Sequence, residues 1–153
     1  MHTYGLLRNS FQPPDEIRIM RTMWRHRAGL VAEAASCIQR IQKSMAEMNL
    51  QLGNAIGDLS GMTGMAILHA ILNGERDPSK LAARAQPGIK APQTKIAESL
   101  RGTWREELLF VMRQELDWYE TCKKKIAECD EKLKLHLPIC PRQRASTPLL
   151  RPA

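Results

Sequence analysis

Aromatic residues are scarce in this 153-residue chain, where Phe, Trp and Tyr together account for 5% of the sequence. Runs of β-branched residues are also absent, and the dominance of Leu, Ala, Met, Glu, Lys and Arg favours helix. No apolar run approaches the ~20 residues that span a bilayer. The N-terminal segment Met1–Ser10 lacks the apolar stretch of a signal peptide. We therefore expect an all-α, cytoplasmic protein that does not enter a membrane and keeps its cysteines reduced.

Recognisable catalytic and metal-binding patterns are missing as well. Ser60 and Thr63 lie among glycines, but no lysine follows them as in a P-loop. The histidines form no H-E-x-x-H motif, and the carboxylates form no recognisable acid–base pair. Cys129, His136 and Cys140 do not match a common zinc spacing. The cysteines of the expected helices are interpreted as small packing residues: Cys37, Cys122 and Cys129. The residues alone predict no catalytic activity and no cofactor in this chain.

The N-terminal half instead carries a long apolar heptad pattern. A first heptad set, with members seven residues apart, comprises Ile17, Trp24, Val31, Ile38, Met45, Leu52 and Leu59. A second heptad set has Arg27 as its one polar member and otherwise comprises Met20, Ala34, Ile41, Met48 and Ala55. A period near 3.5 residues is typical of a helix that packs along another helix. We expect this helix to run from about Asp15 to about Ile56, with the acidic pair Asp15 and Glu16 stabilised by the helix dipole.

A similar pattern lies in the C-terminal half. The stretch Thr103–Glu106 matches a capping box, so we expect a second long helix to begin there and to reach about His136. Its apolar positions, interrupted by Glu115, are Leu108, Met112, Tyr119, Cys122, Ile126, Cys129 and Leu133. Two such helices predict either an antiparallel pair within one chain or a coiled coil between chains, and the sequence does not separate these alternatives.

Glycine and proline divide the segment between the two long helices. We expect a bend or break between Asp58 and Gly64. Short helices are expected at 65–72, ended by Gly74, at 79–85, opened by Asp77-Pro78, and after Pro92. Residues 1–14 are expected to be irregular, residues 15–137 to form the helical region, and residues 138–153 to form a basic, proline-rich, disordered tail.

The chain is basic, with a formal net charge of +7 and a pI of about 9.5. Arg18, Arg21 and Arg25 fall on one stripe of the first helix, with Arg27 beside them and Trp24 among them. Such a stripe can contact phosphates, although a solvated basic face has the same pattern. A second basic run, 123–125, is flanked by glutamates at i,i+4 spacing, which favours ordinary helix ion pairs.

Five stretches carry a resemblance to a known family. They are Met48–Leu52, Ser60–Ile67, Ala70–Pro78, Leu100–Arg105 and Ile126–Asp130. Over roughly residues 4–133, the chain resembles transposases of the insertion-sequence one-hundred-and-ten family. The runs Met-Asn-Leu-Gln-Leu and Gly-Glu-Arg-Asp-Pro are the most specific in combination, and either alone is a weak signal.

The resemblance implies a helical, partly coiled-coil region that connects two catalytic parts and helps subunits to assemble into homo-oligomers. Full-length members carry a RuvC-like domain with four acids that bind Mg²⁺ and a later domain with a nucleophilic serine, and a structured guide RNA directs recombination of DNA. Here the acids would lie before Met1 and the serine domain after Leu133. We therefore expect a truncated transposase fragment, inactive alone, whose partners are DNA and guide RNA. The alternatives are a free-standing coiled-coil interaction protein and a basic nucleic-acid-binding module.

Overall fold

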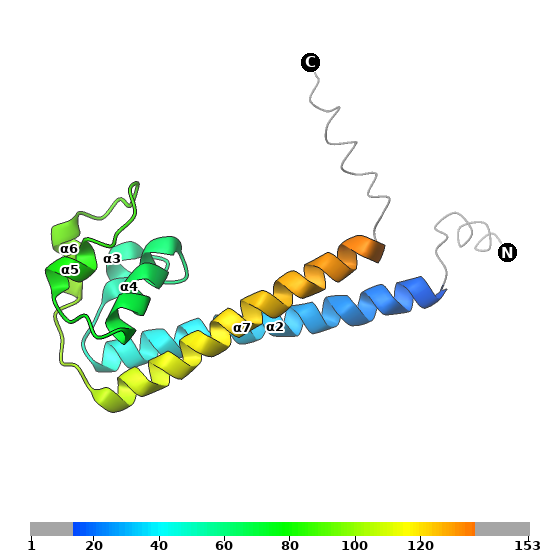
Figure 1. The fold of residues 1–153 in the computed structure, drawn as a ribbon, viewed down its shortest axis with the longest axis horizontal. Coiled ribbons are helices and arrows are strands. Elements are labelled where there is room, and N and C mark those ends of the chain that lie inside the picture. Colours follow the sequence, from blue (N-terminus) through cyan, green and yellow to red (C-terminus); the bar gives the residue numbers. More distant parts are fainter. Residues whose placement is uncertain (1–13, 137–153) are drawn as a thin grey trace, which may run out of the picture. The chain divides into compact units, whose positions relative to one another are not determined.

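The computed structural model describes residues 14–136, which contain helices and loops but no strand (Figure 1). The helices are α2 (Pro14–Glu47), α3 (Leu52–Ile56), α4 (Met62–Leu72), α5 (Pro78–Ala82), α6 (Gln93–Ser99) and α7 (Glu106–His136). The predicted all-α fold, with two long helices joined by short ones, is confirmed. Pro14, predicted to be irregular, is the first residue of α2. The rest of the predicted irregular segment and the predicted tail 138–153 lie outside the described residues.

The chain divides into two compact units. The described part of the first, here called the hairpin-end unit, consists of residues 14–31 and 123–136. The second, here called the core unit, is Ala32–Cys122. The helices α2 and α7 contribute residues to both units, whereas the short helices belong to the core unit alone.

Within each unit, the segments of α2 and α7 pack against each other in opposite directions. In the hairpin-end unit, Glu16 contacts His136 and Arg27 contacts Asp130. In the core unit, Arg40 contacts Glu115. The partner number on α7 falls as the residue number on α2 rises, which defines an antiparallel pair. Of the two arrangements left open by the sequence, the structure has the antiparallel pair within one chain.

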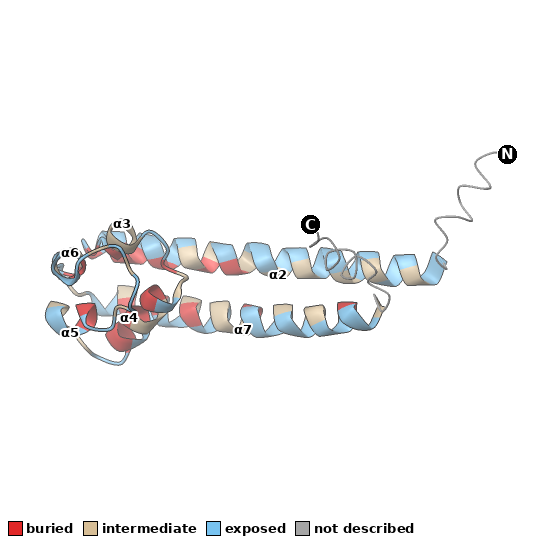
Figure 2. Ribbon diagram, turned by 90° about the horizontal axis from the view of Figure 1, so that it is seen from above, coloured by how far each residue is buried: buried red, intermediate tan, exposed pale blue. Residues whose placement is uncertain are grey.

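The hydrophobic core lies in the core unit, where the short helices meet the adjoining parts of α2 and α7 (Figure 2). Five residues predicted to form the helix contact are almost fully buried here: Ile41, Met45, Met48, Leu52 and Met112. Two others, Ile38 and Tyr119, are partly buried against the same core. In the hairpin-end unit, Leu133 is buried and Ile126 is half-buried. These predicted packing positions are thus buried or half-buried within the single chain.

The first three members of the first heptad set do not pack as predicted. Ile17, Trp24 and Val31 retain 37%, 48% and 44% of their accessible surface. The second heptad set is the more enclosed, since Ala34 is buried and Met20 and Arg27 are half-buried. At 100° per residue, neighbouring members of the two sets lie roughly 40–60° apart around α2, and over residues 17–31 the second set is the more enclosed of the two. The prediction that Val31 is a packing residue is therefore wrong.

The first long helix ends earlier than the apolar pattern predicts. It stops at Glu47, and Asn49 adopts a positive φ of 65° that turns the chain. The Leu50 amide then donates to the Met45 carbonyl at 2.8 Å, which closes the helix end. Leu50 and Leu52 are both buried, so the apolar pattern continues across the turn into α3. The prediction of a single helix to Ile56 is therefore incorrect, because the chain turns at Asn49 before Leu50 and Leu52 enter the core.

The predicted capping box is also incorrect. The helix α7 begins at Glu106, and the Leu109 amide donates to the Arg105 carbonyl at 3.0 Å. Thr103 instead lies in the preceding loop, where its amide donates to the Met48 carbonyl at 2.9 Å. The backbone is therefore held by a distant segment at the point where local pattern predicted a helix start.

The predicted breaks in the middle of the chain are confirmed. After α3 the chain turns at Gly57, whose φ is 81°. Gly74 follows α4 with a φ of 105°, which a residue with a Cβ rarely adopts. The Asp77 carboxylate accepts a hydrogen bond from the Ser79 amide at 3.0 Å and caps α5, with Pro78 as first helical residue. Two of these helices differ in their bounds, since α4 already begins at Met62 and α5 ends at Ala82.

Candidate functional site

Four of the five stretches that carry the family resemblance lie in the core unit, and the fifth, Ile126–Asp130, lies in the hairpin-end unit. The Gln51 amide donates to the Ser99 carbonyl at 2.8 Å, and the Thr103 amide donates to the Met48 carbonyl at 2.9 Å. A Cβ on Gly102 would lie 2.2 Å from the Met48 carbonyl oxygen. The segments 48–52 and 99–103 are therefore joined at backbone contact, which explains why a glycine stands at position 102.

The Gly-Glu-Arg-Asp-Pro run is held by hydrogen bonds and one ring contact. The Arg76 guanidinium lies 4.8 Å from the centroid of the Trp104 ring and donates to the Ile71 carbonyl at 2.6 Å. The Glu75 carboxylate accepts from the Asp77 and Arg76 amides, and these bonds hold its pKa below its usual value. The run thus joins the end of α4 to the loop before α7, a contact between two of the resembling stretches.

The hydroxyls of the glycine-rich stretch have structural partners. The Ser60 hydroxyl donates to the Asp58 carboxylate at 2.6 Å, and this bond together with the Ser60 amide lowers the Asp58 pKa. Thr63 is buried, and its hydroxyl oxygen accepts from the Gln86 amide at 2.9 Å. A Cβ on Gly64 would lie 2.1 Å from the Leu59 carbonyl oxygen. These residues therefore build the packing of α4.

Between α2 and α7, the core unit contains a buried thiol beside an ion pair. Glu115, the polar exception of the second pattern, accepts from Arg40 at 3.0 Å. Burial, together with the neighbouring Glu115 carboxylate, raises the pKa of the Cys37 thiol to about 12. Cys37 and Cys122 are both fully buried. A thiol held neutral in this way acts as a packing group rather than as a nucleophile.

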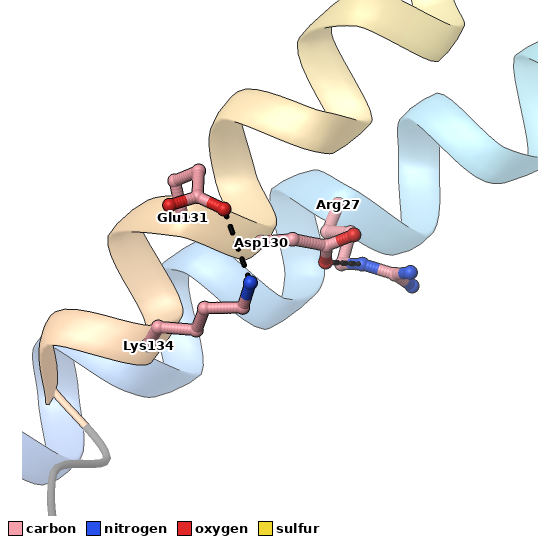
Figure 3. A network of polar contacts seen from close by, with 4 residues as sticks. All are labelled: Arg27, Asp130, Glu131 and Lys134. Carbon is pink, nitrogen blue, oxygen red and sulfur yellow. Dashed lines mark hydrogen bonds and ion pairs between the residues drawn. The ribbon is translucent and has the colours of Figure 1, made fainter.

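The hairpin-end unit carries the predicted arginine stripe. Arg27 Nε lies 2.6 Å from an Asp130 carboxylate oxygen (Figure 3). The Arg27 guanidinium lies 5.7 Å from the Trp24 ring centroid. Arg18 pairs with Asp15 at 3.1 Å, with both side chains largely exposed. Arg21 and Arg25 are exposed and form no ion pair within residues 14–136. Of the four predicted residues, Arg21 and Arg25 therefore have the charge most available to a ligand.

The positive charge is unevenly distributed between the two units. Residues 14–31 and 123–136 contain nine Lys and Arg against five Asp and Glu, a formal excess of four. Residues 32–122 contain ten Lys and Arg against eleven Asp and Glu. Within the described chain, the basic excess thus lies entirely in the hairpin-end unit. Sequence reasoning used the overall net charge and so missed this uneven distribution. The difference in charge becomes visible only when the two units are counted separately.

A second surface lies on α7 within the core unit. Phe110, Val111 and Trp118 retain 59%, 41% and 43% of their accessible surface. Val111 and Trp118 are seven residues apart, so they share a face of the helix. Sequence reasoning did not select these residues, because they fall outside the heptad positions that pack against α2. Large apolar side chains that remain exposed together are typical of a surface with a protein partner.

The described residues offer no metal centre and no membrane span. Within residues 14–136, no three His, Cys, Asp or Glu side chains form a group that could hold a metal ion. In the same range, no helix combines the length and apolarity needed to cross a membrane.

The chain matches no protein-family model, no curated protein and no solved structure. The resemblance to the transposase family accordingly depends on the sequence motifs alone.

Proposed function

We propose that this chain is the helical connecting and oligomerisation region of a transposase that resembles the insertion-sequence one-hundred-and-ten family. In this proposal, the region supports DNA recombination by holding two catalytic parts and two or more subunits in position. The chain itself is a fragment without cutting activity. DNA and guide RNA come from the resemblance, the cytoplasmic location comes from the sequence, and all three belong to the proposal.

The observation that carries the proposal is the closeness of the two ends of the helical pair. Glu16, in the first turn of α2, lies 3.1 Å from His136, the last residue of α7. A domain attached before α2 and a domain attached after α7 would therefore join the hairpin-end unit at neighbouring points. A connecting region with this geometry brings two catalytic parts together, although their attachment points at Glu16 and His136 are 120 residues apart in the sequence.

The exposed α7 face supports the oligomerisation part of the proposal. Phe110, Val111 and Trp118 are uncovered in the single chain, and a second copy would bury them. Light scattering of the purified chain should give the mass of a dimer or larger oligomer. The double variant Phe110→Ser/Trp118→Ser should reduce this mass to that of a monomer. Met62→Ser removes a side chain that is 76% exposed in the same unit and should leave the mass unchanged.

A monomeric wild-type chain would contradict the oligomerisation role. The fragment hypothesis has a separate test in the DNA on either side of the reading frame. We expect code for the four-acid domain upstream and for the serine domain downstream, either in frame or interrupted. Flanking DNA without a trace of either would overturn the transposase assignment. Mg²⁺-dependent cleavage of DNA by the purified chain would overturn the proposal that the fragment is inactive alone.

A further inference from the structure

Trp24 is half-exposed in the hairpin-end unit, although a tryptophan is the most costly apolar side chain to leave in water. Its neighbours in sequence are basic. Arg21 lies one turn before it, Arg25 follows it directly, and both are exposed. The exposed part of α2 therefore presents an indole ring beside two guanidinium groups that have no ion-pair partner within the described residues.

The ring is held in place from one side. Asp130 on α7 contacts Arg27 Nε at 2.6 Å, and the Arg27 guanidinium lies 5.7 Å from the Trp24 ring centroid. A guanidinium near a ring is attracted by the electron density of the ring face. Because Asp130 belongs to the other helix, the contact also fixes the arginine that supports the ring. The indole is therefore ordered before any ligand arrives, and ordering in advance lowers the entropic cost of binding.

The charge of this unit selects the class of ligand. The formal excess of four positive charges on the described hairpin-end residues attracts polyanions, whereas the core unit has a small acidic excess. Arginine recognises phosphate oxygens through paired N–H donors. An exposed aromatic ring beside arginines is the arrangement by which proteins bind unpaired bases. An anionic membrane would also be attracted, but a membrane-surface helix needs a broad continuous apolar face. The large apolar side chains exposed on this part of α2 are separate residues interspersed with arginines: Ile17, Ile19, Trp24 and Val31.

We propose that the α2 face formed by Arg21, Trp24 and Arg25 binds single-stranded nucleic acid. One base stacks on the Trp24 ring, and adjacent phosphates contact Arg21 and Arg25. In a duplex the bases are already stacked and paired, so a duplex offers the ring no base and engages only the arginines. The inference rests on the proposed function for the presence of nucleic acid, which it extends by naming a strand type and a contact surface.

The test is fluorescence anisotropy with a labelled oligo-dT of about 15 nucleotides, within the range that stacking proteins occupy. Trp24→Ala should weaken binding about tenfold without changing the salt dependence, because stacking releases no counterions. Trp24→Phe should retain most of the affinity. Arg21→Gln/Arg25→Gln should weaken binding and lower the salt slope by about 1.4, since a single-strand phosphate contact contributes about 0.7.

Two matched controls accompany these variants. Met62→Ala removes a large apolar side chain that is 76% exposed in the core unit and should leave oligo-dT binding unchanged. Lys43→Gln/Arg84→Gln removes two exposed charges from the core unit and should have a much smaller effect than the Arg21/Arg25 pair. Circular dichroism establishes that each variant is folded, and light scattering gives its mass.

Several results would overturn the proposal. The wild-type chain could fail to bind oligo-dT, or could bind a duplex of the same length equally or more tightly. Folded Trp24→Ala could bind oligo-dT as tightly as the wild type, or Trp24 could be needed for binding to phosphatidylserine vesicles in place of oligo-dT. A Trp24→Ala variant that lost its oligomeric mass together with its binding would assign the ring to assembly and would equally overturn it. The oligomerisation role is tested separately, by the light-scattering mass of the Phe110→Ser/Trp118→Ser variant.

Discussion

Replacing Gly102 with Ala places a methyl group where another part of the backbone already lies. The added Cβ would be 2.2 Å from the Met48 carbonyl oxygen, 2.8 Å from Leu50 Cδ2 and 3.1 Å from the Asn49 carbonyl carbon. Unstrained carbon–oxygen contacts are about 3.3 Å or longer. The two segments must therefore separate by about an ångström, and the 2.9 Å hydrogen bond from the Thr103 amide to the Met48 carbonyl is lost.

The expected magnitude follows from these contacts. Overpacking against a rigid neighbour costs about 1–3 kcal/mol, and loss of the hydrogen bond adds about 1 kcal/mol. Gly102 does not have a positive φ, so the alanine gains about 0.5–1 kcal/mol from a less flexible unfolded chain. We expect the Gly102→Ala variant to lose about 2–3 kcal/mol of its free energy of unfolding, measured by urea denaturation followed by circular dichroism.

The matched control is Gly29→Ala. Gly29 lies inside α2, and a Cβ there would meet nothing within 4 Å. Because alanine is the better helix former, this variant should gain up to about 1 kcal/mol. A Gly102→Ala variant as stable as the wild type, or a shift of the same sign in both variants, would refute the close backbone contact at Met48.

Further predictions concern the contacts that hold the core unit. Arg76→Lys should lose about 1 kcal/mol of unfolding free energy, because an ammonium group cannot both stack on Trp104 and present the planar donors of arginine; a variant as stable as the wild type in urea would contradict this. Cys37 should resist alkylation in the native protein at pH 8, since its pKa of about 12 keeps the thiol neutral, and should react in urea; mass spectrometry of the labelled peptide distinguishes these results. The lowered pKa of Asp58 means that its contribution to stability is present above the usual carboxyl pKa and is lost as the pH falls through the lowered value. Ser60→Ala should therefore destabilise the protein by less than about 1 kcal/mol at pH 7, and this difference should shrink at pH 3; a difference that grows on acidification would contradict the assignment.

The sequence predicted the elements whose signals are local. Asp77-Pro78 opens α5 and Gly74 follows α4, because an N-cap carboxylate and a positive φ depend on few neighbours. The end of α7 at His136 was also predicted. The long apolar pattern correctly indicated two packed helices, because its period reflects the line along which one helix contacts the other.

Other features depended on distant partners and could not be read locally. The turn at Asn49 interrupts a pattern that continues into α3, because both sides of the turn contribute to one core. Thr103 matches a cap in sequence, yet its amide is bound by Met48, which is remote in the chain. The choice between two heptad sets on α2 depended on where α7 lies, and this choice left Trp24 and Val31 exposed.

The candidate site was predicted in part for the same reason. The arginine stripe was visible from spacing, but the pairing of Arg27 with Asp130 joins residues that are far apart in sequence. Because Arg27 pairs with Asp130, it is less available to a ligand than Arg21 and Arg25 are. Its contact with Trp24 also orders the indole ring.

The most direct test of the account is the distance between the two ends of the helical pair. Pulsed electron paramagnetic resonance would report it from two spin labels, one at position 19 and one at position 134. The labels are carried by non-canonical amino acids, because thiol labelling would also modify the native cysteines. Because neighbouring helix axes lie about 8–10 Å apart and each label adds its own length, we predict a narrow distribution at roughly 20–30 Å that persists when labelled chains are diluted with unlabelled ones. A signal lost on dilution, or a distance near the ~50 Å length of α2 at ~1.5 Å per residue, would contradict the intramolecular antiparallel pair and the connecting role derived from it.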